Sequence, residues 1–131
     1  MKLFHRKIES WEVVDQKSVE PISIFSPDER DEMEIANVYD ATMCGTYLFE
    51  LKKVANLRGA VVFARERLLR DAAAKGYNVF LIEGWKVTHL RKGKQERAEV
   101  RYWGRPAYAA VEPPQGQMPP FIAMLDTRSI A

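Results

Sequence analysis

The clearest pattern of hydrophobic and polar positions runs from residue 59 to residue 109, where a helical period gives way to a strand period. Residues 59–75 are mostly strong helix formers, and the Gly76 that follows is a common helix stop. Apolar side chains recur there every three or four positions, which predicts a helix with one buried stripe. The stripe consists of Val61, Val62, Ala64, Leu68, Leu69, Ala72 and Ala73.

The next stretch, residues 77–109, has the composition and alternation of a β-hairpin. β-Branched and aromatic residues dominate its first arm, and Lys92-Gly93 is the expected two-residue turn. That turn places Lys86 opposite Glu99 on a face of paired charges and directs Trp85 to an apolar face. Such a division is typical of a half-buried antiparallel sheet.

Together these elements predict an α+β fold, in which an antiparallel sheet containing the hairpin is packed by the helix in a β-α-β-β-like core. Leu81, Trp85 and Val100 should face the helix. A chain of 131 residues suits one domain, which we place at residues 1–111. Residues 112–131 are proline-rich at their start and should form an extended C-terminal tail, either docked through its apolar end or disordered.

The N-terminal half is patterned less clearly. Ser26 followed by proline and two acids is a helix-start signature, so we expect a short helix over residues 27–37. Residues 19–25 fit a short strand, which Pro21 would confine to a sheet edge. Residues 38–58 fit both a helical stripe and, over their middle part, a strand; we favour a helix after Gly45.

Composition and charge narrow the function classes. A net charge of +2 gives no general attraction to nucleic acid or membranes. The single cysteine, Cys44, excludes an intrachain disulfide and favours a reducing compartment. No apolar run approaches the ~20 residues of a membrane span. We therefore expect a soluble, cytoplasmic protein that does not enter a membrane.

Three polar residues fall on the core-facing side of these elements: Arg65 in the helix, Glu83 and Tyr102 in the hairpin. A lone buried arginine is costly, so we expect Arg65 to pair with Glu83 beside the Tyr102 hydroxyl. One interpretation is a structural ion pair at the rim of the core. The other is a polar spot in an apolar pocket of a small-molecule-binding protein or small enzyme, which would bind an anionic or amide ligand.

A second set of residues suggests contact between copies of the chain. Phe63 lies on the polar side of the helix, and Phe80, Ile82 and Trp103 make the second face of the hairpin apolar near its base. Apolar surface of this kind needs a cover. We therefore expect a homo-oligomer and, as the leading function, a non-catalytic, self-associating binding or structural protein.

The basic hairpin tip offers a further alternative, a nucleic-acid accessory factor whose tip touches phosphates, although charged tips are usually only solvated. The tip cations are Arg91, Lys92, Lys94 and Arg97. His5, His89 and Cys44 have no metal-ligand spacing, and no catalytic motif is recognisable. We expect no metal and no cofactor, and we favour a non-catalytic protein over the small enzyme.

Residues 59–109 resemble the small bacterial YbjQ-type family, sometimes labelled heavy-metal-binding. The segments that carry the likeness are Ala73-Ala74-Lys75-Gly76-Tyr77-Asn78 and Gly104-Arg105-Pro106-Ala107. The resemblance implies a β-α-β-β core and a ring-like homo-oligomer, and it implies no reaction. The threonine-rich N-terminal hairpin of that family has no evident counterpart here.

Overall fold

The computed structural model describes residues 10–52, 56–113 and 117–126, and it confirms the α+β fold with an antiparallel sheet. Its elements, in chain order, are β1 (Glu12–Ser23), α1 (Pro27–Met33), β2 (Ile35–Val38), β3 (Met43–Glu50), α2 (Leu57–Ala74), β4 (Val79–Lys92), β5 (Gln95–Ala109) and the 3-10 helix η1 (Ile122–Asp126). None of the helices in these described ranges has the length and apolar character needed to cross a membrane.

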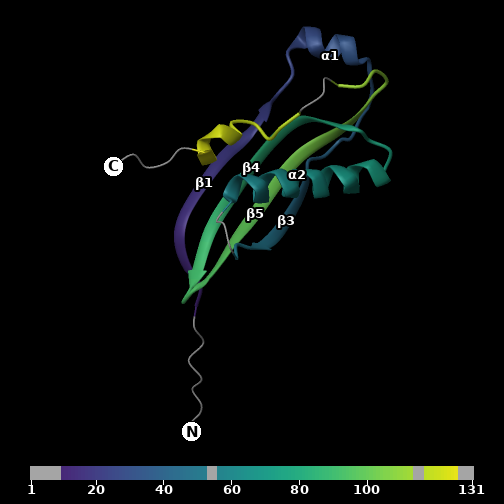
Figure 1. Ribbon diagram of the computed structural model, residues 1–131. Coiled ribbons are helices and arrows are strands. Elements are labelled where there is room, and N and C mark those ends of the chain that lie inside the picture. Colours follow the sequence, from purple (N-terminus) through teal and green to yellow (C-terminus); the bar gives the residue numbers. More distant parts are fainter. Residues whose placement is uncertain (1–9, 53–55, 114–116, 127–131) are drawn as a thin grey trace.

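The sheet is ordered β1-β4-β5-β2, and β3 also pairs with β5 (Figure 1). β3 lies along the first half of β5 and β2 along its last residues, so the two short strands follow one another on the same side of β5. The chain leaves β3, crosses over through α2 and returns in the β4–β5 hairpin. The expected β-α-β-β arrangement is therefore present.

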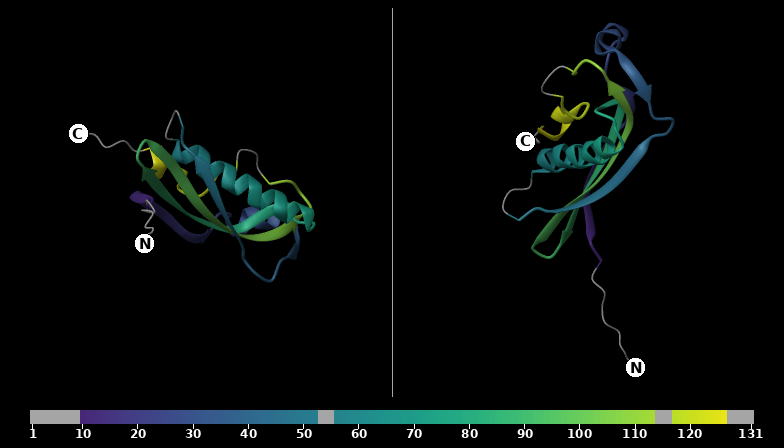
Figure 2. Two further views of the ribbon diagram at one scale, coloured as in Figure 1. Left: turned by 90° about the horizontal axis from the view of Figure 1, so that it is seen from below. Right: turned by 90° about the vertical axis from the view of Figure 1, so that its right-hand side faces the viewer.

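Helix α2 covers one face of this sheet, and η1 lies on the same face (Figure 2). Asn56 caps its N-terminus, because its side chain accepts a hydrogen bond from the Gly59 N–H. Gly76, with a φ of +96°, follows its C-terminus as expected. Val61, Ala64 and other stripe residues are buried against the sheet.

The hairpin turns one residue later than the sequence predicted. Gly93 and Lys94 occupy the turn, and Gly93 has a φ of 63°, as a type II′ turn requires at its first central position. Lys86 consequently lies opposite Arg101, not Glu99. Because the pairing shifts by two residues, the side chains still keep their faces.

A β-bulge in β4 between Phe80 and Ile82 changes which residues face α2. Phe80 is fully buried in the cluster under α2, whereas Leu81 packs with Phe25 and Met33 in a second cluster. The prediction that Leu81 faces α2 is therefore wrong. The sequence gives no sign of the bulge, because the adjoining residues are equally apolar and either could point inward.

The expectation of a helix after Gly45 is also wrong, because this segment forms strand β3. Its side chains alternate strictly between half-buried and exposed, the period of a strand with one covered face. β3 fills the free side of β5 without any irregularity in register. A pairing partner distant in sequence thus decided between two patterns that both fit locally.

Helix α1 begins as predicted and ends earlier. Ser26 and Glu29 form a reciprocal capping box. Glu34 then adopts the left-handed conformation with a φ of 51°, which stops the helix at Met33 rather than at residue 37. Met33 is buried against the sheet face opposite α2, so α1 covers one end of that face.

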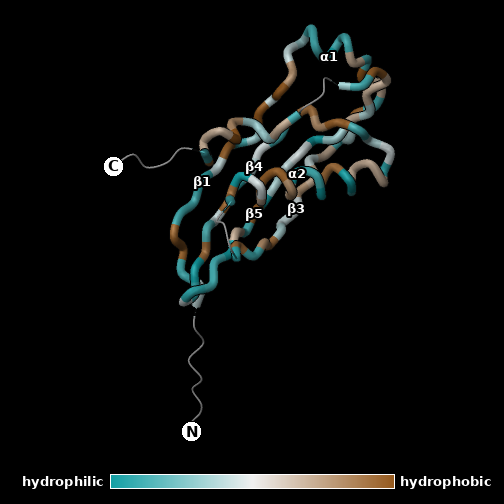
Figure 3. The backbone as a smooth tube through the Cα atoms, in the orientation of Figure 1, coloured by the Kyte–Doolittle hydropathy of each residue, from teal (hydrophilic) through white to brown (hydrophobic). Residues whose placement is uncertain are grey.

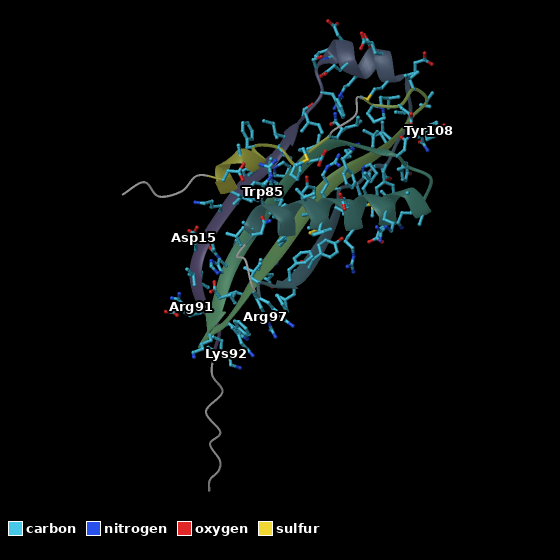
Figure 4. All side chains as sticks on the ribbon, in the orientation of Figure 1. Asp15, Trp85, Arg91, Lys92, Arg97 and Tyr108 are labelled. Atoms are coloured by element: carbon cyan, nitrogen blue, oxygen red, sulfur yellow. The ribbon has the colours of Figure 1, made fainter. Side chains whose placement is uncertain are left out.

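The C-terminal segment docks on the domain. Ile122 is buried in the main core cluster, and the Trp85 indole N–H donates to the Pro120 carbonyl over 2.8 Å. Arg58 at the start of α2 pairs with Asp126. Figure 4 shows Trp85 in the middle of the sheet beside this segment. Of the two possibilities left open for the tail, residues 117–126 therefore follow the docked one.

Candidate functional site

The buried polar group predicted from the sequence is present. The Nε of Arg65 donates to Oε1 of Glu83 over 2.7 Å, and its Nη2 lies 3.3 Å from Oε2. The Tyr102 hydroxyl donates to Oε1 over 2.5 Å. The predicted Arg65–Glu83 pair is thus confirmed. Tyr102 lies opposite Trp85 and reaches Glu83 diagonally, because of the shifted register.

Burial and pairing together set the charges in this group. Burial opposes the charge of Arg65, but the hydrogen bond and attraction of Glu83 outweigh it, so the pKa of the guanidinium is raised. Burial, followed by the negative charge of Glu83, raises the pKa of Tyr102 well above its ordinary value. Tyr102 therefore stays a neutral hydrogen-bond donor, and Arg65 neutralises the carboxylate.

Solvent does not reach the centre of this group. Glu83 and Tyr102 are 0% exposed and Arg65 is 7% exposed. Each oxygen of the Glu83 carboxylate already accepts at least one hydrogen bond from a side chain. This closure favours the structural interpretation over a ligand pocket at Arg65, Glu83 and Tyr102.

The four residues expected at an oligomer interface occupy three different environments. Phe80 lies inside the core and contributes no surface, so its expected exposure is wrong. Ile82 is half-buried against the second cluster. Trp103 is half-buried on the sheet face turned away from α2, and Phe63 is 59% exposed on α2.

Phe63 belongs to an aromatic flank between α2 and β3. Its ring lies 6.4 Å from that of Phe49 in a tilted arrangement, and Arg67 stands 5.6 Å above the ring of Tyr47. We call Tyr47, Phe49, Phe63 and Arg67 the aromatic flank. It runs beside the outer side of β3, where the described part of the chain provides no further strand.

The two outer strands of the sheet differ in how they are protected from further pairing. β1 contains a proline, Pro21, four charged residues and two register irregularities. These are common devices that prevent edge pairing. β3 has no proline, no irregularity and one charged residue, Glu50, at its end. The β3 edge is therefore the unprotected one.

The sheet face turned away from α2 carries a row of polar residues that the sequence did not predict. Ser18 lies opposite Lys86, Lys86 opposite Arg101, and Arg101 opposite Thr46. Directly opposite residues share a face, so a hydroxyl, an ammonium, a guanidinium and a second hydroxyl form one line across four strands. We call these four residues the cationic row. The row was not apparent from the sequence, because the turn expected at Lys92-Gly93 would place Lys86 opposite Glu99.

The two cations of this row lack partners that their neighbours have. Lys86 and Arg101 form no ion pair or hydrogen bond through their side chains within the described ranges. On the same face, Arg97 donates to Glu50 over 2.6 Å, and Arg105 donates to a backbone carbonyl over 3.0 Å. On this face, the positive charge of the cationic row is thus not paired with any described carboxylate.

The basic hairpin tip, in contrast, is largely engaged. Arg97 stacks 4.2 Å from the centroid of the Trp11 ring, which also lies 5.7 Å from the Lys92 ammonium. His89 lies 2.6 Å from a carboxylate oxygen of Glu96. Figure 3 shows the tip as a hydrophilic end of the molecule. These contacts favour an internally satisfied, solvated tip.

Comparison of the chain with protein-family models, curated proteins and solved structures gave no match. The resemblance to the YbjQ-type family stays a prediction. Within the described ranges, no group of three or more histidine, cysteine, aspartate or glutamate side chains is placed to hold a metal ion.

Proposed function

We propose that this protein is a non-catalytic, self-associating protein that forms a two-fold dimer by antiparallel pairing of β3 with the β3 of a second copy. The observation that supports this proposal is the contrast between the unprotected β3 edge and the protected β1 edge. A regular, nearly uncharged edge strand offers a row of backbone hydrogen-bonding groups to another strand.

The sequence of β3 is compatible with pairing to itself. With the two-fold axis at Tyr47, Phe49 faces the partner's Gly45, and Leu48 faces the partner's Thr46. The remaining pair is Glu50 with the partner's Cys44, so no like charges meet. An isologous contact of this kind closes after two subunits, and it joins the two sheets into one continuous sheet.

The aromatic flank gives this pairing an apolar component. Pairing about an axis perpendicular to the sheet keeps both α2 helices on the same face. The exposed ring of Phe63 then lies beside the junction, where the flank of the second copy can cover it. Complete burial of an exposed phenylalanine contributes about 1.5–3 kcal/mol, and the 59% of Phe63 that is exposed sets its share of that range. The YbjQ-type resemblance instead implies a ring-like oligomer, which would be a larger particle than this dimer.

Sedimentation velocity over a wide concentration range tests this proposal. We expect a particle of twice the 15.1 kDa chain mass. The variants Leu48→Lys on β3 and Phe63→Lys on α2 should each raise the dissociation constant at least about tenfold. Leu48→Lys places a cation on the edge strand, which is a common device against edge pairing, and Phe63→Lys buries an unpaired charge. Both side chains are exposed, at 55% and 59%, so the monomer should fold normally.

Val13→Lys is the matched control, because Val13 is also 55% exposed but lies on β1. It should leave the dissociation constant unchanged. A monomer at the highest concentrations would overturn the proposal. So would a larger closed assembly, or an equal loss of association in all three variants.

A further inference from the structure

We propose that the face of the sheet turned away from α2 binds a small planar aromatic phosphate, with the phosphate on the cationic row and the ring against Trp103. This inference concerns a face other than the β3 edge and does not depend on self-association. Its basis is the uncompensated charge of Lys86 and Arg101, together with the shape of the surface around them.

Lys86 and Arg101 are held close together by the backbone. They lie directly opposite each other in β4 and β5, which places their Cβ atoms about 4.5–5.5 Å apart. Like charges in such a pair repel, and no described side chain bridges them. A phosphate with its charge of about −1.5 to −2 matches both cations, and an arginine fork beside a lysine is a common way to bind it.

The remaining members of the row supply hydrogen bonds. Ser18 and Thr46 flank the two cations on β1 and β3 and are both exposed. Their hydroxyl groups can donate to phosphate oxygens. A flat row that combines two cations with two hydroxyl donors therefore suits a single tetrahedral anion.

Two adjoining depressions provide the space. They have volumes of about 610 and 210 Å³ and share Lys86 and Gln16 in their walls. Trp103 lines the larger depression and Arg101 the smaller one. The larger volume lies within the range of about 300–1,000 Å³ that is typical of small-molecule sites.

Trp103 is placed to contact a ring. It lies two residues after Arg101 on the same face of β5, directly opposite Gly84 in β4. Because glycine has no side chain, nothing covers Trp103 from β4. A Cβ at Gly84 would stand 2.6 Å from the backbone N of Pro21, which shows how closely the bulge of β1 approaches here. Pro21 also lines the larger depression. Tryptophan and proline thus both line the depression that would receive a planar ring.

Nearby carboxylates argue for a small ligand rather than a nucleic acid. Glu99 lies on the same face as Arg101, two residues away, and Glu20 lines the larger depression. The surroundings of the row are therefore close to neutral as a whole. A polyanion needs an extended positive surface, whereas one phosphate needs only the two cations.

Titration of the ¹⁵N-labelled full chain with phenyl phosphate at neutral pH tests the proposal. The indole N–H signals separate the sites, because Trp11 lies at the hairpin tip beside Lys92 and Arg97, lines neither depression and serves as an internal reference. We expect the Trp103 signal to shift in a saturable manner. Inorganic phosphate, benzoate and benzyl alcohol, which each lack part of the ligand, should bind at least about fivefold more weakly.

Lys86→Met and Arg101→Met should each weaken binding about tenfold or more, because each removes a charged hydrogen bond. Trp103→Ala should weaken it at least about fivefold and Trp103→Phe much less, because a stacking surface remains. Lys94→Met at the exposed tip is the matched control and should have no effect. Without ligand, Lys86→Met should unfold at the same temperature as the parent chain or higher, because it relieves repulsion.

An unshifted Trp103 signal would overturn the proposal, as would equal binding of inorganic phosphate and phenyl phosphate. Affinity that rises with the length of an oligonucleotide and falls in Lys94→Met would do so as well, because it would identify the hairpin tip as a nucleic-acid site. Each of these results leaves the dimer proposal untouched, because sedimentation measures that separately.

Discussion

At the scale of single residues, Glu83 is the centre of the buried polar group. It accepts hydrogen bonds from Arg65 on α2 and from Tyr102 on β5, and it is itself 0% exposed. A buried carboxylate is tolerated only with such partners. The three side chains therefore fix the position of α2 over the hairpin, since a shift of the helix would leave charges unpaired.

Removing the cation should reveal this dependence. We expect Arg65→Met to lower the free energy of unfolding by about 3–5 kcal/mol, because an uncompensated buried charge remains. Tyr102→Phe removes one hydrogen bond and should cost less, about 1.5–3 kcal/mol. Urea unfolding of each variant measures the difference. Arg70→Met, on the exposed side of α2, should change it by less than ~0.5 kcal/mol; an equal effect of both arginine variants would contradict this account.

Tyr102 also predicts how stability depends on alkaline pH. Its pKa is raised in the folded protein above the ordinary value of 10.0. Above about pH 10, the folded state therefore keeps a proton that the unfolded state loses, so stability falls as pH rises, by up to ~1.4 kcal/mol per pH unit. Below pH 10 this contribution is constant.

The comparison with Tyr102→Phe isolates the effect, because other groups titrate equally in both proteins. The difference in unfolding free energy between the two proteins should shrink as pH rises above 10. Urea titrations at several alkaline pH values measure it. A difference independent of pH would show that Tyr102 ionises equally well in the folded and unfolded states.

At the scale of elements, the C-terminal segment behaves as part of the core rather than as a tail. Ile122 is 8% exposed and joins the cluster under α2, and the segment satisfies the buried indole N–H of Trp85. The described prolines before it, Pro113, Pro119 and Pro120, have no N–H to give to a sheet. Element η1 therefore completes the core on the side of the sheet that α2 covers.

Truncation of one side chain tests this role. Ile122→Ala should lower the free energy of unfolding by about 2–5 kcal/mol, because it leaves a cavity in the core. Met124→Ala is the matched control in the same 3-10 helix; Met124 is 39% exposed, and its loss should cost much less. Thermal or urea unfolding of both variants measures the effect. Equal, small effects would show that η1 adds little to the stability of the domain.

At the scale of the whole molecule, the sheet has two differently treated faces. α2 and η1 cover one face along most of its length, and α1 covers one end of the other (Figure 2). The uncovered part of the second face carries the cationic row, and the outer side of β3 carries the unprotected edge. Both proposals concern parts of the sheet, one face and one edge, that this arrangement leaves uncovered. They place self-association on the β3 edge and ligand binding on the adjoining face, and the two surfaces meet at Thr46.

The sequence by itself determined the features that depend on local periodicity and turn chemistry. The helix preceding Gly76, the long hairpin, the capped start of α1 and the meeting of Arg65, Glu83 and Tyr102 all follow from which face a side chain occupies. The face on which a side chain lies tolerates a small error in the position of the turn. The turn lies at Gly93-Lys94 instead of Lys92-Gly93, which shifts the paired residues by two and therefore by itself leaves every side chain on its expected face.

Only the tertiary structure decided which residues stand beside one another. Strand β3 exists because β5 has a free side, which no local pattern of residues 38–58 reveals. The bulge that exchanges Phe80 and Leu81 depends on how the two clusters fill their space. Lys86 and Arg101 are neighbours because the position of the turn sets the register of the hairpin. The face that the sequence predicted to carry paired charges is therefore the candidate anion-binding face. Long-range pairing and packing fix these positions, and they act on pairs of residues far apart in the chain.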